Sequence, residues 1–147
     1  GLRGLRELRE AIAPDVAADA AQRATTGDLS ALADCRKELE RNEAGSQFEE
    51  LNRRFHDLLG WASGNPLFGL LTSTLHLLTR EFSRSLGYSA QERAVQLRIL
   101  RRVLEAVRTG DAQEARQAMA RLVSGSANYL AERSPDLVSQ KVRWGQI

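Results

Sequence analysis

The amino-acid sequence predicts an all-α protein, an antiparallel bundle of six to seven helices. Apolar residues recur at three- and four-residue spacing along almost the whole chain, which is the period of a buried helix face. Turn signals rich in Gly, Asp, Asn, Ser and Thr separate these stripes, and no β-branched, strand-like run occurs. Short connections place successive helices antiparallel, so the stripes are expected to meet in one core.

The first helix is predicted over about Leu5 to Ala24 and ends at the turn signal Thr25-Thr26-Gly27-Asp28. Asp28 is the expected N-cap of a second helix over about Leu29 to Glu43, because a short acidic side chain accepts hydrogen bonds from free backbone N–H groups. Gly45 ends this second helix. The stripe of the first helix consists of Leu5, Leu8, Ile12, Val16 and Ala20.

The third helix is expected to begin at Ser46, which stands three residues before Glu49 in the spacing of a capping box. It ends at Gly64-Asn65-Pro66, because proline cannot continue a helix but fits the first turn of the next one. That fourth helix covers about Leu67 to Leu86 and stops at Gly87. The two stripes consist of Phe48, Leu51, Phe55, Leu58 and Leu59, and of Leu67, Leu70, Leu71, Leu75, Leu78 and Phe82.

Two more helices have clear start signals. Ser89 with Glu92 has capping-box spacing, and Asp111 with Glu114 repeats it after Thr109-Gly110. Ser134 followed by proline predicts a short terminal helix over about residues 135–142. The stripes of the fifth and sixth helices consist of Val95, Ile99, Val103, Ala106 and Val107, and of Ala115, Ala118, Met119, Leu122 and Val123.

Composition narrows the function. The 21 basic and 19 acidic residues are interspersed and leave a net charge of +2, without the concentrated basic face of a DNA-binding domain. No run is long and apolar enough for a membrane helix, and no secretory signal is seen. Cys35 is the single cysteine, so a reducing cytoplasm is the expected location. Two histidines and no known catalytic motif argue against an enzyme.

Three motifs in order carry a family resemblance. Glu7-Leu8-Arg9 is followed by a run of alanines, Asn52-Arg53-Arg54-Phe55-His56 is followed by an Asn-Pro turn, and a segment over 103–111 is followed by Ala115 and Met119. Along nearly its whole length the chain resembles the FCD effector domain of FadR-like transcription regulators of the GntR superfamily. The resemblance implies one effector-binding and dimerisation domain over residues 1–147.

The same resemblance implies partners. Such regulators form homodimers, bind a small-molecule effector, usually a carboxylate, and contact DNA through a winged helix-turn-helix domain that precedes this one and is absent here. The first and fourth helices have surplus apolar positions and are the candidates for the dimer interface. No membrane contact is expected. The alternative function is a helical protein-interaction module without an effector.

Many members of this family hold a divalent metal with one aspartate and three histidines. The matching positions here are Asn52, His56, Leu100 and Leu122, so only His56 is a family-type ligand. A divalent cation needs three or four protein donors, and one imidazole with one amide is insufficient. No metal or other cofactor is therefore expected. His76 is expected on the surface; the alternative is that it moves in to help hold a metal.

The predicted effector pocket consists of Arg9, Asn52, His56, Leu100 and Leu122. The resemblance directs Arg9 toward the pocket, where a guanidinium suits a carboxylate; alternatively, Arg9 pairs with nearby acids on the helix surface. His56 is either a pocket residue or a core histidine bonded to Asn52. The two leucines make an apolar, fatty-acyl-type ligand the second candidate beside a small carboxylate.

Overall fold

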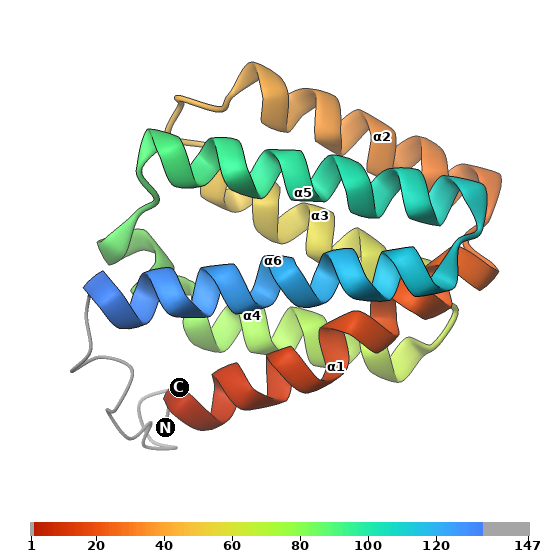
Figure 1. The fold of residues 1–147 in the computed structure, drawn as a ribbon, viewed down its shortest axis with the longest axis horizontal. Helices are drawn as coiled ribbons and strands as arrows, with labels where there is room; N and C mark the ends of the chain where they lie inside the picture. Colours follow the sequence, from red (N-terminus) through yellow and green to blue (C-terminus); the bar gives the residue numbers. More distant parts are fainter. Residues whose placement is uncertain (1, 134–147) are drawn as a thin grey trace.

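The computed structural model describes the backbone of residues 2–133 and the side chains of residues 3–80 and 87–125. Within this part the chain is all-α, which confirms the predicted fold class, and Figure 1 shows the helices side by side as a bundle. The expected terminal helix over 135–142 lies outside the described residues. The helices are α1 (Leu2–Arg23), α2 (Thr26–Arg41), α3 (Phe48–Ala62), α4 (Pro66–Leu86), α5 (Ala90–Thr109) and α6 (Ala112–Arg133).

Helix α1 has a central place in the bundle. It packs along α6 and also contacts α3, α4 and α5, whereas α2 lies against α3 and α5. The second half of α1 presents Ala17 and Ala20, both fully buried, and side chains this small let neighbouring helices approach closely. Around them the core is filled by the larger buried side chains Phe48, Phe55, Leu59, Leu97, Leu100, Met119 and Leu122.

Two of the predicted helix starts are wrong in detail. The N-cap of α2 is Thr25: its Oγ1 accepts a hydrogen bond from the Asp28 N–H at 3.1 Å, and Asp28 Oδ2 accepts one from the Thr25 N–H at 2.9 Å. Asp28 is thus the third residue of a capping box rather than the cap. Ser46 does not cap α3, which begins at Phe48, because Glu49 accepts hydrogen bonds from Arg93 and the Tyr88 N–H instead.

Gly45 does not end α2, which ends at Arg41 with Asn42 as its C-cap. Three other predicted signals are confirmed. Ser89 Oγ accepts a hydrogen bond from the Glu92 N–H, and Asp111 Oδ1 accepts one from the Glu114 N–H, both at 3.1 Å. Gly110 ends α5 with φ +76°, a left-handed conformation that glycine adopts without steric cost.

The stripe predicted for α4 is only partly buried. Leu75 is 5% exposed and faces the interior, but Leu67 and Leu70 are 66% and 56% exposed and Leu71 is 39% exposed. The difference arises because α4 has apolar residues on two sides, and only one side can face the core. None of the described helices is both long and apolar enough to cross a membrane.

Candidate ligand-binding site

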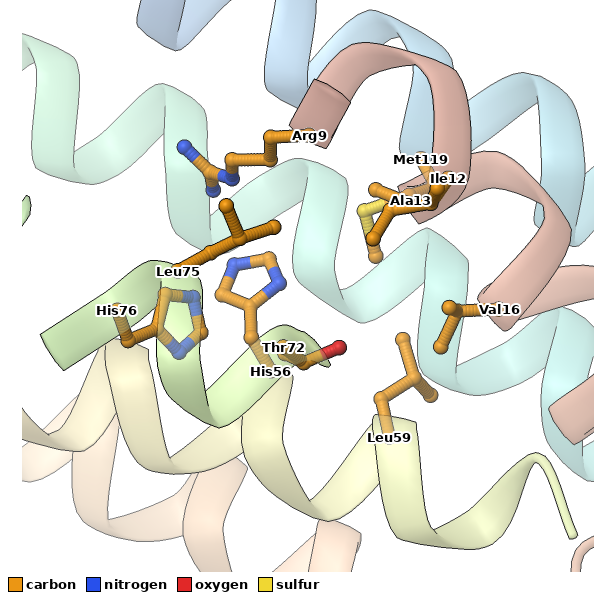
Figure 2. A pocket seen from close by; sticks show the side chains of 10 residues that line it. All are labelled: Arg9, Ile12, Ala13, Val16, His56, Leu59, Thr72, Leu75, His76 and Met119. Carbon is orange, nitrogen blue, oxygen red and sulfur yellow. The ribbon is translucent and has the colours of Figure 1, made fainter. Parts of the chain in front are cut away.

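A small cavity lies inside the bundle between α1, α3, α4 and α6, with a volume of about 20 Å³. Most of its wall is apolar, and we call it the apolar chamber (Figure 2). Its polar groups are the guanidinium of Arg9, the imidazoles of His56 and His76, and the hydroxyl of Thr72. The remaining lining residues are Ile12, Ala13, Val16, Leu59, Leu75 and Met119.

A second chamber of about 40 Å³ shares Arg9, His56 and His76 with the first one. We call it the polar chamber, because all its lining side chains carry polar atoms. Besides the three shared residues these are Glu49, Asn52, Arg53, Thr79 and Tyr88. The three shared side chains therefore stand where an apolar and a polar space adjoin.

Arg9 is a half-buried cation without a carboxylate partner among the described residues. The acids beside it in the sequence are engaged elsewhere: Glu7 pairs with Arg3 at 3.4 Å, and Glu10 with Arg6 at 3.9 Å. Burial lowers the pKa of Arg9, but a guanidinium stays charged at any physiological pH. The surface ion pair considered for Arg9 is thus not formed with a described acid, although the charge of Glu10 acts on Arg9 from nearby.

His56 is 6% exposed and lies one helical turn from Asn52, as the sequence spacing predicts. Its Nε2 and the Oδ1 of Asn52 are buried without a hydrogen-bond partner among the described residues, so the pairing of His56 with Asn52 is not formed. Burial, and then the positive charge of Arg9 and the neighbouring His76, hold the pKa of His56 well below its ordinary value. His56 is therefore neutral near pH 7 and leaves Arg9 as the charged group at the junction.

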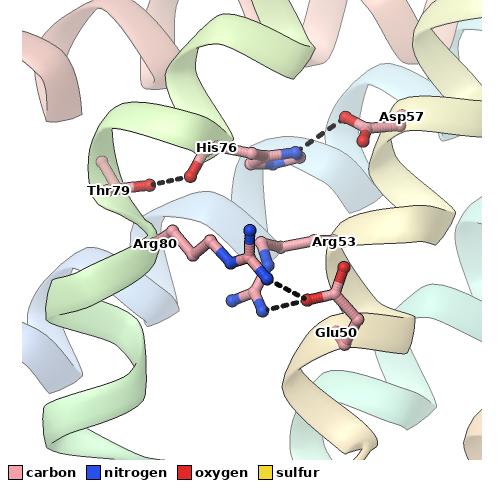
Figure 3. Close-up of polar contacts among 6 residues, drawn as sticks. All are labelled: Glu50, Arg53, Asp57, His76, Thr79 and Arg80. Atoms are coloured by element: carbon pink, nitrogen blue, oxygen red, sulfur yellow. Dashed lines mark hydrogen bonds and ion pairs between the residues drawn. The ribbon is translucent and has the colours of Figure 1, made fainter. Parts of the chain in front are cut away.

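His76 was expected on the surface, and this prediction is wrong. Its side chain is 12% exposed, and its Nδ1 lies 2.8 Å from Asp57 Oδ1 (Figure 3). Its ring meets that of His56 edge to face, with centroids 5.7 Å apart. Burial lowers the pKa of His76, while the bond to Asp57 opposes this shift. The outer side of α4 is occupied by leucines, and its polar side faces α3. The sequence signal for this orientation was the spacing of His76 with Thr72 and Arg80, which places the three polar residues on one face of the helix.

The structure brings together three of the five residues predicted for the pocket, namely Arg9, Asn52 and His56. Leu100 and Leu122 are 0% and 1% exposed and belong to the apolar core. Neither side chain lines the apolar or the polar chamber. The predicted pocket left out His76 and Arg53, which do line the polar chamber.

The residues present do not fit the metal centre of the related domains. Among the described residues no group of three or more His, Cys, Asp or Glu side chains could hold a metal ion. The four family positions offer one imidazole and one amide, since Leu100 and Leu122 have no donor atoms. The cationic Arg9 beside His56 further opposes a second positive charge at this place.

Comparisons with known proteins agree with this architecture. The family model described as the FCD domain matches residues 5–125. A solved structure titled Streptococcus agalactiae GntR matches with a TM-score of 0.72 and 21% sequence identity, covering 87% of this chain and 58% of that chain. No curated protein matches the sequence. Because the family model spans most of the chain and the observed fold is all-α, the chain belongs to the FCD domain family.

Proposed function

We propose that this domain is the effector-sensing and dimerisation part of a GntR-type transcription regulator of the FadR-like branch, and that its effector is a small carboxylate bound at Arg9. The observation that carries the proposal is the Arg9 guanidinium at the junction of two internal chambers, where it forms no ion pair with a carboxylate whose side chain the structure describes. The matched GntR chain is longer, with 58% of it covered, which leaves room for the DNA-binding domain that such a regulator needs.

The electrostatics at the junction favour a carboxylate. A guanidinium presents paired donors that match the two oxygens of a carboxylate, and the pairing strengthens where water is excluded. The pKa values of the neighbouring His56 and His76 are lowered, so these imidazoles add no positive charge near pH 7. Arg9 is the charged side chain among the three residues that line both chambers, so one carboxylate matches its charge.

The size of the chambers supports one of the two ligand classes that the sequence left open. A cavity of 20 to 40 Å³ holds about one or a few water molecules. An acid of a few carbon atoms exceeds either chamber as observed, so its entry requires α1 or α4 to move outward. A long acyl chain would need a cavity several times larger, so the observed chambers favour the short acid.

Replacing Arg9 with glutamine tests the proposal. We expect affinity for a short acid, with propionate and butyrate as probes in calorimetric titration, to fall about 10- to 100-fold, because a hydrogen bond to a charged group contributes about 1.5–3 kcal/mol. Arg54→Gln is the control, since Arg54 is exposed and outside both chambers. Equal affinities of Arg9→Gln and wild type would contradict the site. Absence of acid binding by a folded wild-type domain would favour the alternative, a helical protein-interaction module.

The dimer interface is proposed on the outer face of α4. Leu67, Leu70 and Leu77 are more than half exposed there, and Trp61 on α3 is 50% exposed. From residue 58 to residue 79 the sequence has no Asp, Glu, Lys or Arg. An exposed apolar surface of this kind marks a contact site, and a second copy of the same face covers it in a two-fold symmetric dimer.

A charge on this face should separate the dimer. We expect Leu70→Glu combined with Leu77→Glu to shift the domain to monomers in sedimentation at micromolar concentration, because both carboxylates would be buried unpaired at the interface. Ser30→Glu, at an exposed position on α2, is the control and should leave the mass unchanged. A dimer that persists in the double variant would place the interface elsewhere, with α1 as the next candidate.

A further inference from the structure

The wall of the polar chamber is built from helices except at one residue. The other lining residues come from α1, α3 and α4, whereas Tyr88 lies in the connection between α4 and α5. The Tyr88 side chain is partly buried and packs against the apolar core. Packed helices must give up a large buried surface to separate, but a short connection can move by itself. The part of the wall that opens most readily is therefore the part that Tyr88 closes.

The connection covers residues 87–89 and begins at a hinge residue. Gly87 has a left-handed φ of +57°, and a Cβ at this residue would meet no atom within 4 Å. The two helices that it joins have different main neighbours: α4 packs against α3, whereas α5 packs against α6 and α2 (Figure 1). A glycine in open space lets the chain turn at this point, so the end of α4 can shift without carrying α5 with it.

One carboxylate fastens Tyr88 to α3. Glu49 Oε1 accepts a hydrogen bond from the Tyr88 N–H at 3.3 Å, and the same oxygen accepts one from Arg93 Nη2 at 3.3 Å. Hydrogen bonds to a carboxylate are usually shorter, about 2.7–2.9 Å. Both bonds to this oxygen are thus long, and the contact that holds the connection against α3 is one that can open and close.

Arg93 holds this carboxylate in position. Its Nη1 donates to the carbonyl oxygens of Glu43 at 3.1 Å and Gly45 at 3.4 Å, and its guanidinium lies 5.5 Å from the centroid of the Phe48 ring. These contacts anchor Arg93 to the turn between α2 and α3, while its Nη2 binds Glu49. Its Nε is buried without a hydrogen-bond partner among the described residues. An unpaired buried donor has a free-energy cost, which lowers the preference for this closed arrangement over an open one.

We propose that the connection over residues 87–89 is the gate through which an effector reaches the internal chambers, and that Glu49, positioned by Arg93, is its latch. In the closed state the Tyr88 N–H is bonded to Glu49, and the Tyr88 side chain closes the polar chamber. In the open state this bond is broken, the chain turns at Gly87, and solvent reaches His56. The inference rests on the proposed effector site for its purpose, whereas the opening is testable without an effector.

Chemical modification of His56 measures the opening. Diethyl pyrocarbonate reacts with neutral imidazoles and is larger than either chamber, so it reaches the buried Nε2 of His56 only when the bundle opens. We expect Arg93→Gln to raise the rate of His56 modification, followed by mass spectrometry, about 10-fold or more, because it removes a hydrogen bond between charged groups. Tyr88→Ala, which removes the side chain that closes the chamber, should raise this rate as well.

Arg101→Gln is the matched control. Arg101 also lies on α5 and donates to a carboxylate, Glu40 Oε1, at 2.8 Å, but its side chain is 50% exposed and lines neither chamber. We expect the His56 modification rate of this variant to stay within about twofold of the wild-type rate, because exposed ion pairs contribute little to stability. A wild-type rate in Arg93→Gln, or an equal rise in Arg101→Gln, would overturn the latch.

Hydrogen exchange of the wild-type domain keeps the gate testable even where a variant fails to fold. A local opening exposes little surface, so exchange of the Tyr88 amide should depend only weakly on urea concentration. Amides in the centre of α6 should exchange through global unfolding, with a steep dependence on urea. An equally steep dependence for Tyr88 would overturn the gate.

The outcomes separate the gate from the proposed effector site. Acid binding that is lost in Arg9→Gln, together with an unchanged His56 modification rate in Arg93→Gln, would overturn the latch and leave the carboxylate site standing. A gate that opens as expected in a domain that binds no short acid would contradict the carboxylate site at Arg9 and leave the gate standing.

Discussion

Replacing Leu100 with alanine should lower the free energy of unfolding by about 2–5 kcal/mol, the usual cost of removing most of a fully buried leucine side chain. Leu100 is 0% exposed and lies in the apolar core, so its truncation leaves a cavity surrounded by buried side chains. Since small domains have a total stability of about 5–15 kcal/mol, this loss is large. Urea denaturation followed by circular dichroism measures it.

The same variant decides whether Leu100 belongs to the effector pocket, as the sequence predicted. Because its side chain lines neither chamber, we expect the folded Leu100→Ala domain to bind short acids with wild-type affinity, within about twofold. Leu100→Met, which nearly preserves volume, should cost less than about 1.5 kcal/mol and serves as the control. A large loss of acid affinity in Leu100→Met would restore Leu100 to the pocket.

The stability of the domain should fall as the pH is lowered from 6.5 toward 4.5. The pKa values of His56 and His76 are lowered in the folded state, so below pH 6.5 the unfolded chain binds protons that the folded chain does not. Stability is therefore complete above the unfolded pKa and decreases below it, by about 1.4 kcal/mol per pH unit for each histidine that remains neutral. Urea denaturation at closely spaced pH values measures this slope.

The acidic residues act in a different range. The pKa values of Glu40 and Glu105 are lowered by hydrogen bonds from Arg101 and Arg108, so their contribution is lost only below their ordinary value of 4.5. Between pH 4.5 and 6.5 the dependence of stability on pH arises from the histidines. The variant His56→Gln should reduce this slope by up to about 1.4 kcal/mol per pH unit, the value for one proton. An unchanged slope in that variant would mean that His56 is protonated within the folded bundle.

Local signals in the sequence were sufficient for most of the fold. Capping residues such as Ser89 and Asp111 and stop signals such as Gly110 act through the nearest backbone groups, so their effect is readable from spacing alone. Ser46 failed because Glu49 bonds to Arg93, more than 40 residues away. Such a competing partner is set by tertiary structure, which spacing within one helix does not contain.

The site was predictable only where one helix carries it. Asn52 and His56 lie four residues apart on α3, so their proximity follows from helical geometry. His76 reaches them because α3 and α4 approach closely at Gly60 and Gly69, where an added Cβ at residue 69 would lie 2.5 Å from the Trp61 ring. That approach depends on how two helices pack, and a single sequence shows the glycines without showing what they face.

The proline within α1 gives this helix two mechanically different halves. Pro14 has no N–H, so the carbonyl of Glu10 lacks its regular helical hydrogen bond at that point. Beyond Pro14, Ala17 and Ala20 are locked in the core, whereas Arg9 on the near side is only half buried. The backbone hydrogen bonding of α1 is therefore interrupted between the part that carries Arg9 and the part packed in the core, and we expect the helix to bend there if Arg9 moves on binding an anion.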